Sequence, residues 1–315
     1  MARLVFLGTP EAAVAPLHSL VDAGHEVGLV VSRADKRRGR GAGLVPSPVK
    51  AAALELGLPV TASLDDIADS GAELGVVVAF GRIIPVSVLG RVPMVNLHFS
   101  LLPRWRGAAP VERAILEGDA ETGVCLMAVE AGLDTGAIYA EDSTVIDENE
   151  TADQLRSRLV VMGCKLLDDH LAGGISTLPR PRDQIGTPSY AEKILSGELE
   201  LQWGQPALQV NRVVRLGRAW TTYRGRRLGV VRACPVPEEQ QREDGHREDG
   251  QAEAAPGGTG PAGPGTLDGS VVTAGDGTRL RLITVQPEGK RPMDADDWVR
   301  GFRPEPGERL GATTR

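Results

Sequence analysis

Apolar runs and a helical pattern alternate along the first thirty residues of the chain. An apolar run at 4–7 predicts a buried strand, and the turn after it ends in Pro10, which favours the first turn of a helix. We expect this helix to reach Ala23, where Gly24 would end it, and a second strand to follow at 26–31. A strand–helix–strand unit of this kind is typical of a parallel α/β sheet.

The alternation continues as far as residue 171. The most apolar run, at 74–80, is expected to form a central strand, because strands buried on both faces read as continuous apolar runs. Ser47 and Pro48 are expected to begin a helix. Further strands are expected at 95–99, 122–129 and 138–146, and helices at 49–56, 109–116 and 151–171.

The pattern changes after a proline-rich stretch at 175–189. A short helix is expected from Ala207, followed by short strands and turns at 220–231 and 269–285, which fits a small β-barrel of the OB type. Residues 237–264 repeat Arg-Glu-Asp-Gly and then become rich in Pro, Gly and Ala, so we expect a disordered insertion there. The predicted domains are therefore 1–188 and 207–315, joined by a linker at 189–206.

A polar pair marks the end of the strand predicted at 95–99. Successive strand side chains point to opposite faces, so Asn96 and His98 should emerge side by side on one face. An irregular loop bracketed by Pro103 and Pro110 follows them. Polar residues at a strand end, followed by such a loop, are a common way for α/β proteins to build a site.

Asp134, in a glycine-rich loop at 130–136, adds a carboxylate to this set. An amide can stabilise an oxyanion, an imidazole can carry a proton, and a carboxylate can orient the imidazole or accept a proton itself. The three residue types would suit acyl or one-carbon transfer at a carbonyl. The alternative is that Asn96 and His98 form a satisfied polar pair and that Asp134 forms a turn.

Composition and net charge indicate which kinds of molecule the protein could bind. The chain of 315 residues is 41% hydrophobic and 24% charged, which is typical of a globular protein. The net charge of −7 argues against indiscriminate nucleic-acid binding but leaves room for local basic patches. One such patch is the long loop 32–48, with five basic residues and one acid, which is either a solvated surface loop or a clamp on a polyanion.

Several classes of protein are disfavoured. The sequence after Gly8 departs from G-x-G-x-x-G, which disfavours a nicotinamide cofactor. The three cysteines are scattered and form no CxxC pair, so we expect incidental thiols in a reducing compartment and no bound metal. No apolar run approaches the length of a membrane span, and the apolar N-terminal run is too short for a signal peptide. We therefore expect a cytoplasmic protein that does not associate with membranes.

A series of motifs in order carries a resemblance to a known family. These are F-L-G-T-P, V-V-V-A-F-G, N-L-H-F-S-L-L-P-R-W-R-G-A-A-P, G-D-A-E-T-G-V, G-L-D-T-G, S-Y-A-E-K and V-Q-P-E-G-K-R-P-M. The chain resembles the tetrahydrofolate-dependent formyltransferases, and within them the members that act on methionyl-tRNA. The resemblance implies a Rossmann-like, folate-binding catalytic domain at 1–188 and an OB-like tRNA-binding domain at 207–315.

The same resemblance implies a reaction and assigns residues to it. The formyl group of 10-formyltetrahydrofolate, a co-substrate, would pass to the α-amine of methionyl initiator tRNA for translation initiation. Asn96, His98 and Asp134 would be the catalytic set. The residues expected to bind folate are Phe80, Gly81, Ser100, Leu101, Leu102, Pro103, Gly132 and Leu133. Those expected to bind tRNA are Lys36, Arg37, Arg38, Arg40, Arg215 and Arg218. We expect a monomer.

Two other functions remain open from the residues. One is another folate-dependent formyltransferase that acts on a small amine, such as glycinamide ribonucleotide or a nucleotide sugar. Such an enzyme would not need the basic loop 32–48 or the arginine-rich stretch 212–232. The other is a non-catalytic RNA-binding protein built on a decayed enzyme fold, and the intact set of Asn96, His98 and Asp134 argues against it.

Overall fold

The computed structural model describes residues 1–37, 44–237 and 262–311, and its internal contacts divide the chain into two compact units. The N-terminal unit comprises Met1–Ala114, Asp119–Ile146 and Gln154–Lys193, and the C-terminal unit comprises Ile115–Gly118, Asp147–Asp153 and Ile194–Arg315. Most of the insertion expected at 237–264 lies outside the described residues. The same is true of the tip of the basic loop.

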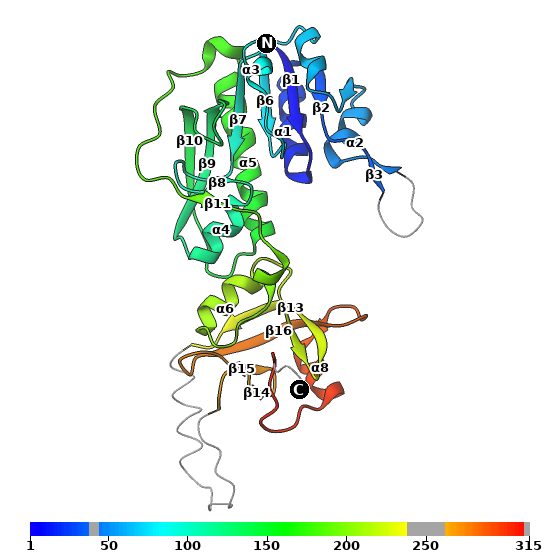
Figure 1. The fold of residues 1–315 in the computed structure, drawn as a ribbon, viewed down its shortest axis with the longest axis vertical. Helices are drawn as coiled ribbons and strands as arrows, with labels where there is room; N and C mark the ends of the chain where they lie inside the picture. Colours follow the sequence, from blue (N-terminus) through cyan, green and yellow to red (C-terminus); the bar gives the residue numbers. More distant parts are fainter. Residues whose placement is uncertain (38–43, 238–261, 312–315) are drawn as a thin grey trace, which may run out of the picture. The chain divides into compact units, whose positions relative to one another are not determined.

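A seven-stranded sheet forms the centre of the N-terminal unit, in the order β10-β9-β7-β6-β1-β2-β5 (Figure 1). Its strands are β1 (Arg3–Gly8), β2 (Glu26–Val31), β5 (Val60–Thr61), β6 (Leu74–Val78), β7 (Met94–His98), β9 (Glu121–Ala128) and β10 (Ile138–Val145). The strand predicted to be central, β6, is the middle strand and is buried throughout.

The expected parallel pairing holds for only part of this sheet. Five strands, β5 to β7 in the sheet order, pair in parallel, whereas β9 is antiparallel to both β7 and β10. For β9 and β10 the reason is the connection: the two strands form a hairpin joined by residues 129–137, without the crossover helix that parallel neighbours require.

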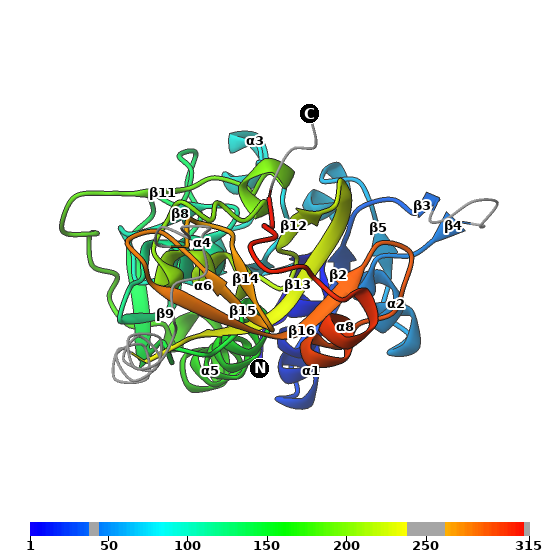
Figure 2. The same ribbon diagram turned by 90° about the horizontal axis from the view of Figure 1, so that it is seen from below.

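Among the described residues, five α-helices accompany the sheet, and all except the one at Val86–Leu89 lie where the sequence predicts them. They are α1 (Val14–Asp22), α2 (Pro48–Glu55), α3 (Val86–Leu89), α4 (Pro110–Glu117) and α5 (Ala152–Leu171). Ser47 caps α2 by accepting a hydrogen bond from the Lys50 amide at 3.1 Å. Helices α1 and α5 lie side by side (Figure 2), and Ser19 donates to Asp168 between them at 2.6 Å.

The C-terminal unit is an antiparallel sheet with helices. The sheet order is β12-β13-β16-β15-β14, with β17 also paired to β16. Its elements are α6 (Ala207–Val214), β12 (Trp220–Tyr223), β13 (Arg226–Pro235), β14 (Leu267–Asp268), β15 (Val271–Thr273), β16 (Arg279–Pro287), β17 (Met293–Asp294) and α8 (Ala295–Phe302). Closure of this sheet into a barrel stays a prediction.

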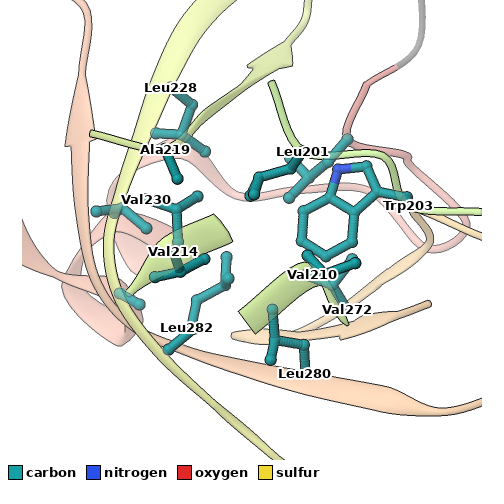
Figure 3. Close-up of a cluster of buried hydrophobic side chains, with 14 of the residues drawn as sticks. Leu201, Trp203, Val210, Val214, Ala219, Leu228, Val230, Val272, Leu280 and Leu282 are labelled. Atoms are coloured by element: carbon teal, nitrogen blue, oxygen red, sulfur yellow. The ribbon is translucent and has the colours of Figure 1, made fainter. Parts of the chain in front are cut away.

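Aliphatic side chains from the sheet and α6 form the core of the C-terminal unit. Figure 3 shows Trp203 packed among Leu201, Val210, Val272 and Leu280. The Trp203 indole is 5% exposed and donates to the Thr221 hydroxyl at 3.0 Å, so its one polar atom is satisfied. Leu201 and Trp203 fall in the segment expected to be a linker, so that part of the chain helps to hold the unit together.

Short elements complete the described chain. They are β3 (Lys36–Arg37), β4 (Leu44–Val45), β8 (Arg106–Gly107), β11 (Tyr190–Ala191) and the 3₁₀ turns at Glu11–Ala13, Asp65–Asp69, Gly174–Thr177 and Ser196–Leu199. Strand β11 pairs in parallel with β8, and Arg182 forms a two-way backbone bridge with Ile138 at 2.8 and 2.9 Å. We call residues 182–191 the strap. Within the described residues, no helix is both long and apolar enough to span a bilayer.

Candidate active site

Strand β7 carries the amide and the imidazole on one face. On the opposite face, Leu97 packs against α5 at Gly163, where a Cβ would lie only 2.5 Å from the Leu97 side chain. Because strand side chains alternate, Asn96 and His98 project away from α5. Helix packing on one face of β7 therefore leaves both polar side chains on the other face.

The loop after β9 brings Asp134 to these two residues. Strand β9 is antiparallel to β7, so its carboxyl end at Ala128 pairs with Val95, early in β7, and the chain then returns across the sheet. Asp134 accepts a long hydrogen bond from Asn96 Nδ2 at 3.4 Å, and its other carboxylate oxygen lies 3.6 Å from His98 Nδ1. The structure thus brings the three residues together in one cluster.

The hydrogen bonds of His98 determine which nitrogen can exchange a proton. Its Nε2 lies 2.9 Å from the backbone oxygen of Trp105, and a carbonyl oxygen can only accept, so Nε2 carries a hydrogen. Nδ1 is left facing Asp134. The imidazole side chain is 6% exposed, so its orientation is set by protein contacts rather than by solvent.

Gly107 provides a backbone donor to the same carboxylate. Its amide donates to Asp134 Oδ2 at 2.8 Å, so Asp134 is held from two sides. Gly107 has φ +125°, and a Cβ there would lie 2.8 Å from the Ala191 carbonyl oxygen. A residue with a side chain would therefore be strained at this position and would displace either the amide or the strap.

Residues 100–106 form a wall beside the cluster. Ser100 is buried and donates to the Arg104 carbonyl at 2.6 Å. The Arg104 side chain donates to Asp119 at 2.9 Å and lies over the Trp105 ring at 4.5 Å, while the Trp105 indole donates to the same carboxylate at 2.7 Å. Asp119 thus anchors the part of the wall whose Trp105 carbonyl orients His98.

The residues expected to bind folate lie in three segments of the N-terminal unit. Phe80 and Gly81 follow β6 after one intervening residue, a second group follows β7, and the third group directly precedes Asp134. The second group comprises Ser100, Leu101, Leu102 and Pro103, and the third comprises Gly132 and Leu133. Their contacts with folate stay predictions.

Cys125 supports the second of these segments. The Leu102 amide donates to its sulfur at 3.5 Å, and burial raises the pKa of the Cys125 thiol to about 12. Cys125 is therefore a neutral, packed thiol beneath the wall, in keeping with the incidental role expected for the cysteines.

The six residues expected to bind tRNA differ in where they lie. Lys36 and Arg37 form β3, whereas Arg38 and Arg40 lie outside the described residues. Arg218 is exposed, as a contact to phosphate requires.

Arg215 is buried within the C-terminal unit. It is 8% exposed and donates to the carbonyl oxygens of Glu150 and Asp147 at 2.8 and 2.7 Å. Burial lowers the pKa of this guanidinium below its ordinary value. Arg215 therefore fastens residues 147–150 inside the C-terminal unit through its Nε and Nη2, and its contact with tRNA stays a prediction.

Two residues of the strap contact the site and were not anticipated from the sequence. Gln184 binds the backbone at Asp134, and Ser189 accepts a hydrogen bond from the Trp105 amide at 2.9 Å. Both lie in a proline-rich segment without periodicity. No pattern in the sequence distinguishes Gln184 from an ordinary loop residue, and the S-Y-A-E-K motif that begins at Ser189 assigns no role to its side chain.

Comparison with known families covers both units. The model of the family described as formyl transferase matches residues 2–170, and the model described as formyl transferase, C-terminal domain, matches residues 193–303. A protein of Methylobacterium sp. (strain 4-46), named methionyl-tRNA formyltransferase, is 39% identical over 98% of this chain and 99% of its own length.

Solved structures share the fold at lower sequence identity. An N-formyltransferase from Helicobacter canadensis, determined with folinic acid and dTDP-3-aminofucose, aligns with a TM-score of 0.66 and 16% identity over 91% of this chain and all of its own. A methionyl-tRNA formyltransferase from Clostridium thermocellum aligns with a TM-score of 0.54 and 15% identity over 76% of this chain and 95% of its own.

Proposed function

The chain belongs to the formyl transferase family, and from this premise we propose that it transfers a formyl group to the α-amine of methionyl initiator tRNA. The observation that carries the proposal is the 39% identity to a methionyl-tRNA formyltransferase over 98% of the chain, which includes the C-terminal unit as well as the catalytic one. The donor would be 10-formyltetrahydrofolate, and the product N-formylmethionyl-tRNA would enter translation initiation.

The chemistry begins with attack by the neutral amine on the formyl carbon. An α-amine has a pKa of about 8, so its neutral form is readily available near neutral pH. Attack converts the formyl oxygen into an oxyanion on a tetrahedral carbon. A primary amide carries two N–H donors, so Asn96 can face Asp134 with one and the oxyanion with the other.

His98 would donate a proton to the oxyanion in this step, and Asp134 would accept one from the amine. Because Nε2 carries a hydrogen toward the Trp105 carbonyl, Nδ1 can present a proton to the oxyanion when His98 is in its doubly protonated form. Asp134, held by the Gly107 amide, would accept the proton that the amine loses, directly or through water. Collapse of the tetrahedral carbon then breaks its bond to the folate nitrogen, which takes up a proton and leaves as tetrahydrofolate, and the formyl group stays on the amine. The proton gained by the folate nitrogen balances the one lost by the amine.

The folate would lie against the segments after β6 and β7. Phe80 and Gly81 would contact the pterin from one side, and residues 100–103 would line the other side. Leu133 is 60% exposed directly beside Asp134, which makes it available to a bound ligand. We expect the protein to act as a monomer in the cytoplasm.

Substitutions in the trio should separate chemistry from substrate binding. Loss of one oxyanion donor commonly lowers kcat by about 10²–10³, so Asn96→Ala should fall in that range. Loss of a general base commonly lowers the rate by about 10²- to 10⁴-fold, and we expect kcat for Asp134→Asn to fall by this amount. The measurement is single-turnover formation of formyl-methionine on initiator tRNA, with tRNA affinity determined in parallel.

Asp142→Asn is the matched control. Asp142 is an exposed carboxylate on β10 of the same unit, and its Oδ1 accepts from the neighbouring Ser143 amide at 2.9 Å. The Asp142→Asn variant should transfer formyl groups at the wild-type rate. Asn96→Ala, Asp134→Asn and Asp142→Asn should all bind tRNA with the wild-type affinity. Normal transfer by Asn96→Ala and Asp134→Asn would remove the trio from the mechanism.

A further inference from the structure

The side chain of Gln184 joins two segments of the active site. Its Nε2 donates to the backbone oxygens of Asp134 and Gly136, both at 2.8 Å. Its Oε1 accepts from Arg106 Nε at 3.1 Å and Nη2 at 2.7 Å. Carbonyls accept and a guanidinium donates, so these four contacts fix which way the amide points.

The backbone that Gln184 binds is the backbone that aims the Asp134 carboxylate. Asp134 has φ +50°, a left-handed conformation that costs free energy in a residue with a side chain and persists only where the surroundings impose it. From this conformation the carboxylate reaches the Gly107 amide and the His98 imidazole. A change in backbone angle at Asp134 would move the carboxylate away from both.

The strap also contacts the wall formed by residues 100–106 and the loop that follows it. The Ser189 hydroxyl accepts from the Trp105 amide at 2.9 Å, and the Ala108 amide donates to the Ala191 carbonyl at 2.8 Å. The same segment therefore contacts the residue whose carbonyl orients His98 and the loop that contains Gly107. Gln184 is the strap side chain that extends this contact to the Asp134 loop.

We propose that Gln184 is a positioning residue for formyl transfer, which holds the Asp134 loop so that the carboxylate faces His98 and the substrate amine. The inference rests on the proposed function, because it assigns Gln184 to that reaction. It goes beyond a structural role for the strap, since the strap has other attachments. The bridge between Arg182 and Ile138 and the pairing of β11 with β8 are both independent of the Gln184 side chain.

Two substitutions test the donor function of Gln184. Gln184→Glu keeps the length of the side chain and its contact with Arg106, but it replaces two donors with an anion facing two carbonyl oxygens. Gln184→Met keeps the length and removes the donors without adding charge. The matched control is Ile185→Ala, because Ile185 lies next in the strap and is 87% exposed.

The expected result is a fall in kcat with little change in KM. Misplacement of a catalytic group by about 1 Å can cost about 10²-fold in rate, so we expect kcat for Gln184→Glu to fall by about 10- to 100-fold. KM for methionyl-tRNA and for folate should change little, because the substitution affects a step after binding. Gln184→Met should show the same split, and Ile185→Ala should match the wild type.

An NMR measurement tests the positioning role of Gln184 independently of any measurement of enzyme activity. The Gly107 amide proton, which donates to Asp134 Oδ2, should shift upfield in the NMR spectrum of glycine-labelled Gln184→Glu as that hydrogen bond lengthens. The Ile185→Ala spectrum should keep this resonance in its wild-type position.

The outcomes separate the two proposals. If the wild-type protein transfers no formyl group to methionyl-tRNA, the proposed function fails, and the Gly107 resonance still reports whether Gln184 positions Asp134. If the wild type is active but both Gln184 variants retain its kcat and its Gly107 resonance, the positioning role is overturned. A rise in KM at unchanged kcat would also overturn it, because Gln184 would then act in binding.

Discussion

At the scale of single residues, the site depends on backbone groups as much as on side chains. The Trp105 carbonyl faces Nε2 of His98 and orients its ring, and the Gly107 amide holds Asp134. Both residues have positive φ values, +63° and +125°, as does Asp134 at +50°. Such conformations cluster at functional sites, where the surrounding contacts impose them.

Replacement of Gly107 should test how far the site depends on the Gly107 backbone amide. In Gly107→Ala the new Cβ would lie 2.8 Å from the Ala191 oxygen at a φ of +125°. We expect a loss of roughly 1–3 kcal/mol in the free energy of unfolding from the backbone strain. We also expect a fall in kcat, because the amide that holds Asp134 must move. Urea unfolding and steady-state kinetics measure the two effects.

Gly197→Ala is a suitable control for this substitution. A Cβ at Gly197 would meet nothing within 4 Å, so stability and kcat should both stay close to wild type. An unchanged kcat in Gly107→Ala would show that the Gly107 amide is not needed to hold Asp134 during the reaction.

Part of this site could be predicted from the sequence, and the reasons differ from residue to residue. The shared face of Asn96 and His98 follows from strand alternation, whereas Asp134 could be added to them only as a candidate with suitable chemistry, because spacing alone does not place a loop residue. Gln184 could not be predicted, because its role comes from a loop that crosses the sheet fifty residues after Asp134. Contacts between irregular segments produce no periodic pattern of apolar residues in the sequence, so they cannot be predicted from it.

At the scale of elements, strong periodicity was a reliable guide and irregular segments were not. The strands β2, β6 and β9 and the helix α5 lie where the apolar pattern predicts them. The direction of β9 could not be read from the pattern, because a buried strand looks the same in either orientation. The short strand β11 was expected to be linker, since two residues paired to a loop carry no signal of their own.

One carboxylate joins the segment after α8 to the start of the C-terminal sheet, beside a backbone hydrogen bond from the Gly311 amide to the Thr222 carbonyl at 2.9 Å. Glu308 accepts from the Tyr223 hydroxyl at 2.9 Å and the Arg224 guanidinium at 2.9 Å. The hydrogen bond from Arg224 is the main reason that the pKa of Glu308 falls from 4.5 to about 2. Its pKa is therefore lower in the folded state than in the unfolded chain.

This depression predicts a specific acid sensitivity. The contribution of Glu308 to stability should be fully present above pH 4.5 and should be lost as the pH falls toward 2. Glu308→Gln should therefore lose stability near neutral pH and show a shallower decline in acid, measured by urea unfolding across this range. Glu288→Gln is the control, because its pair with Arg226 is long, at 3.5 Å, and exposed. Parallel pH profiles for Glu308→Gln and wild type would contradict the attribution.

At the scale of the whole molecule, two units contribute different properties. The N-terminal unit holds the trio and the segments expected to bind folate, while the C-terminal unit carries the arginine-rich stretch 212–232 in a protein of net charge −7. Within that stretch Arg215 is committed to a loop, and Arg218 and Arg232 are exposed. Phosphate binding by such exposed arginines would make tRNA affinity sensitive to salt.

The choice of amine is the most direct test of the account. The measurement compares kcat/KM for transfer of a labelled formyl group from 10-formyltetrahydrofolate to methionyl initiator tRNA, to glycinamide ribonucleotide and to a nucleotide amino sugar. We predict efficient transfer to the α-amine of the tRNA-bound methionine and negligible transfer to the two small amines. Transfer to either small amine in preference to methionyl-tRNA would contradict the proposed function.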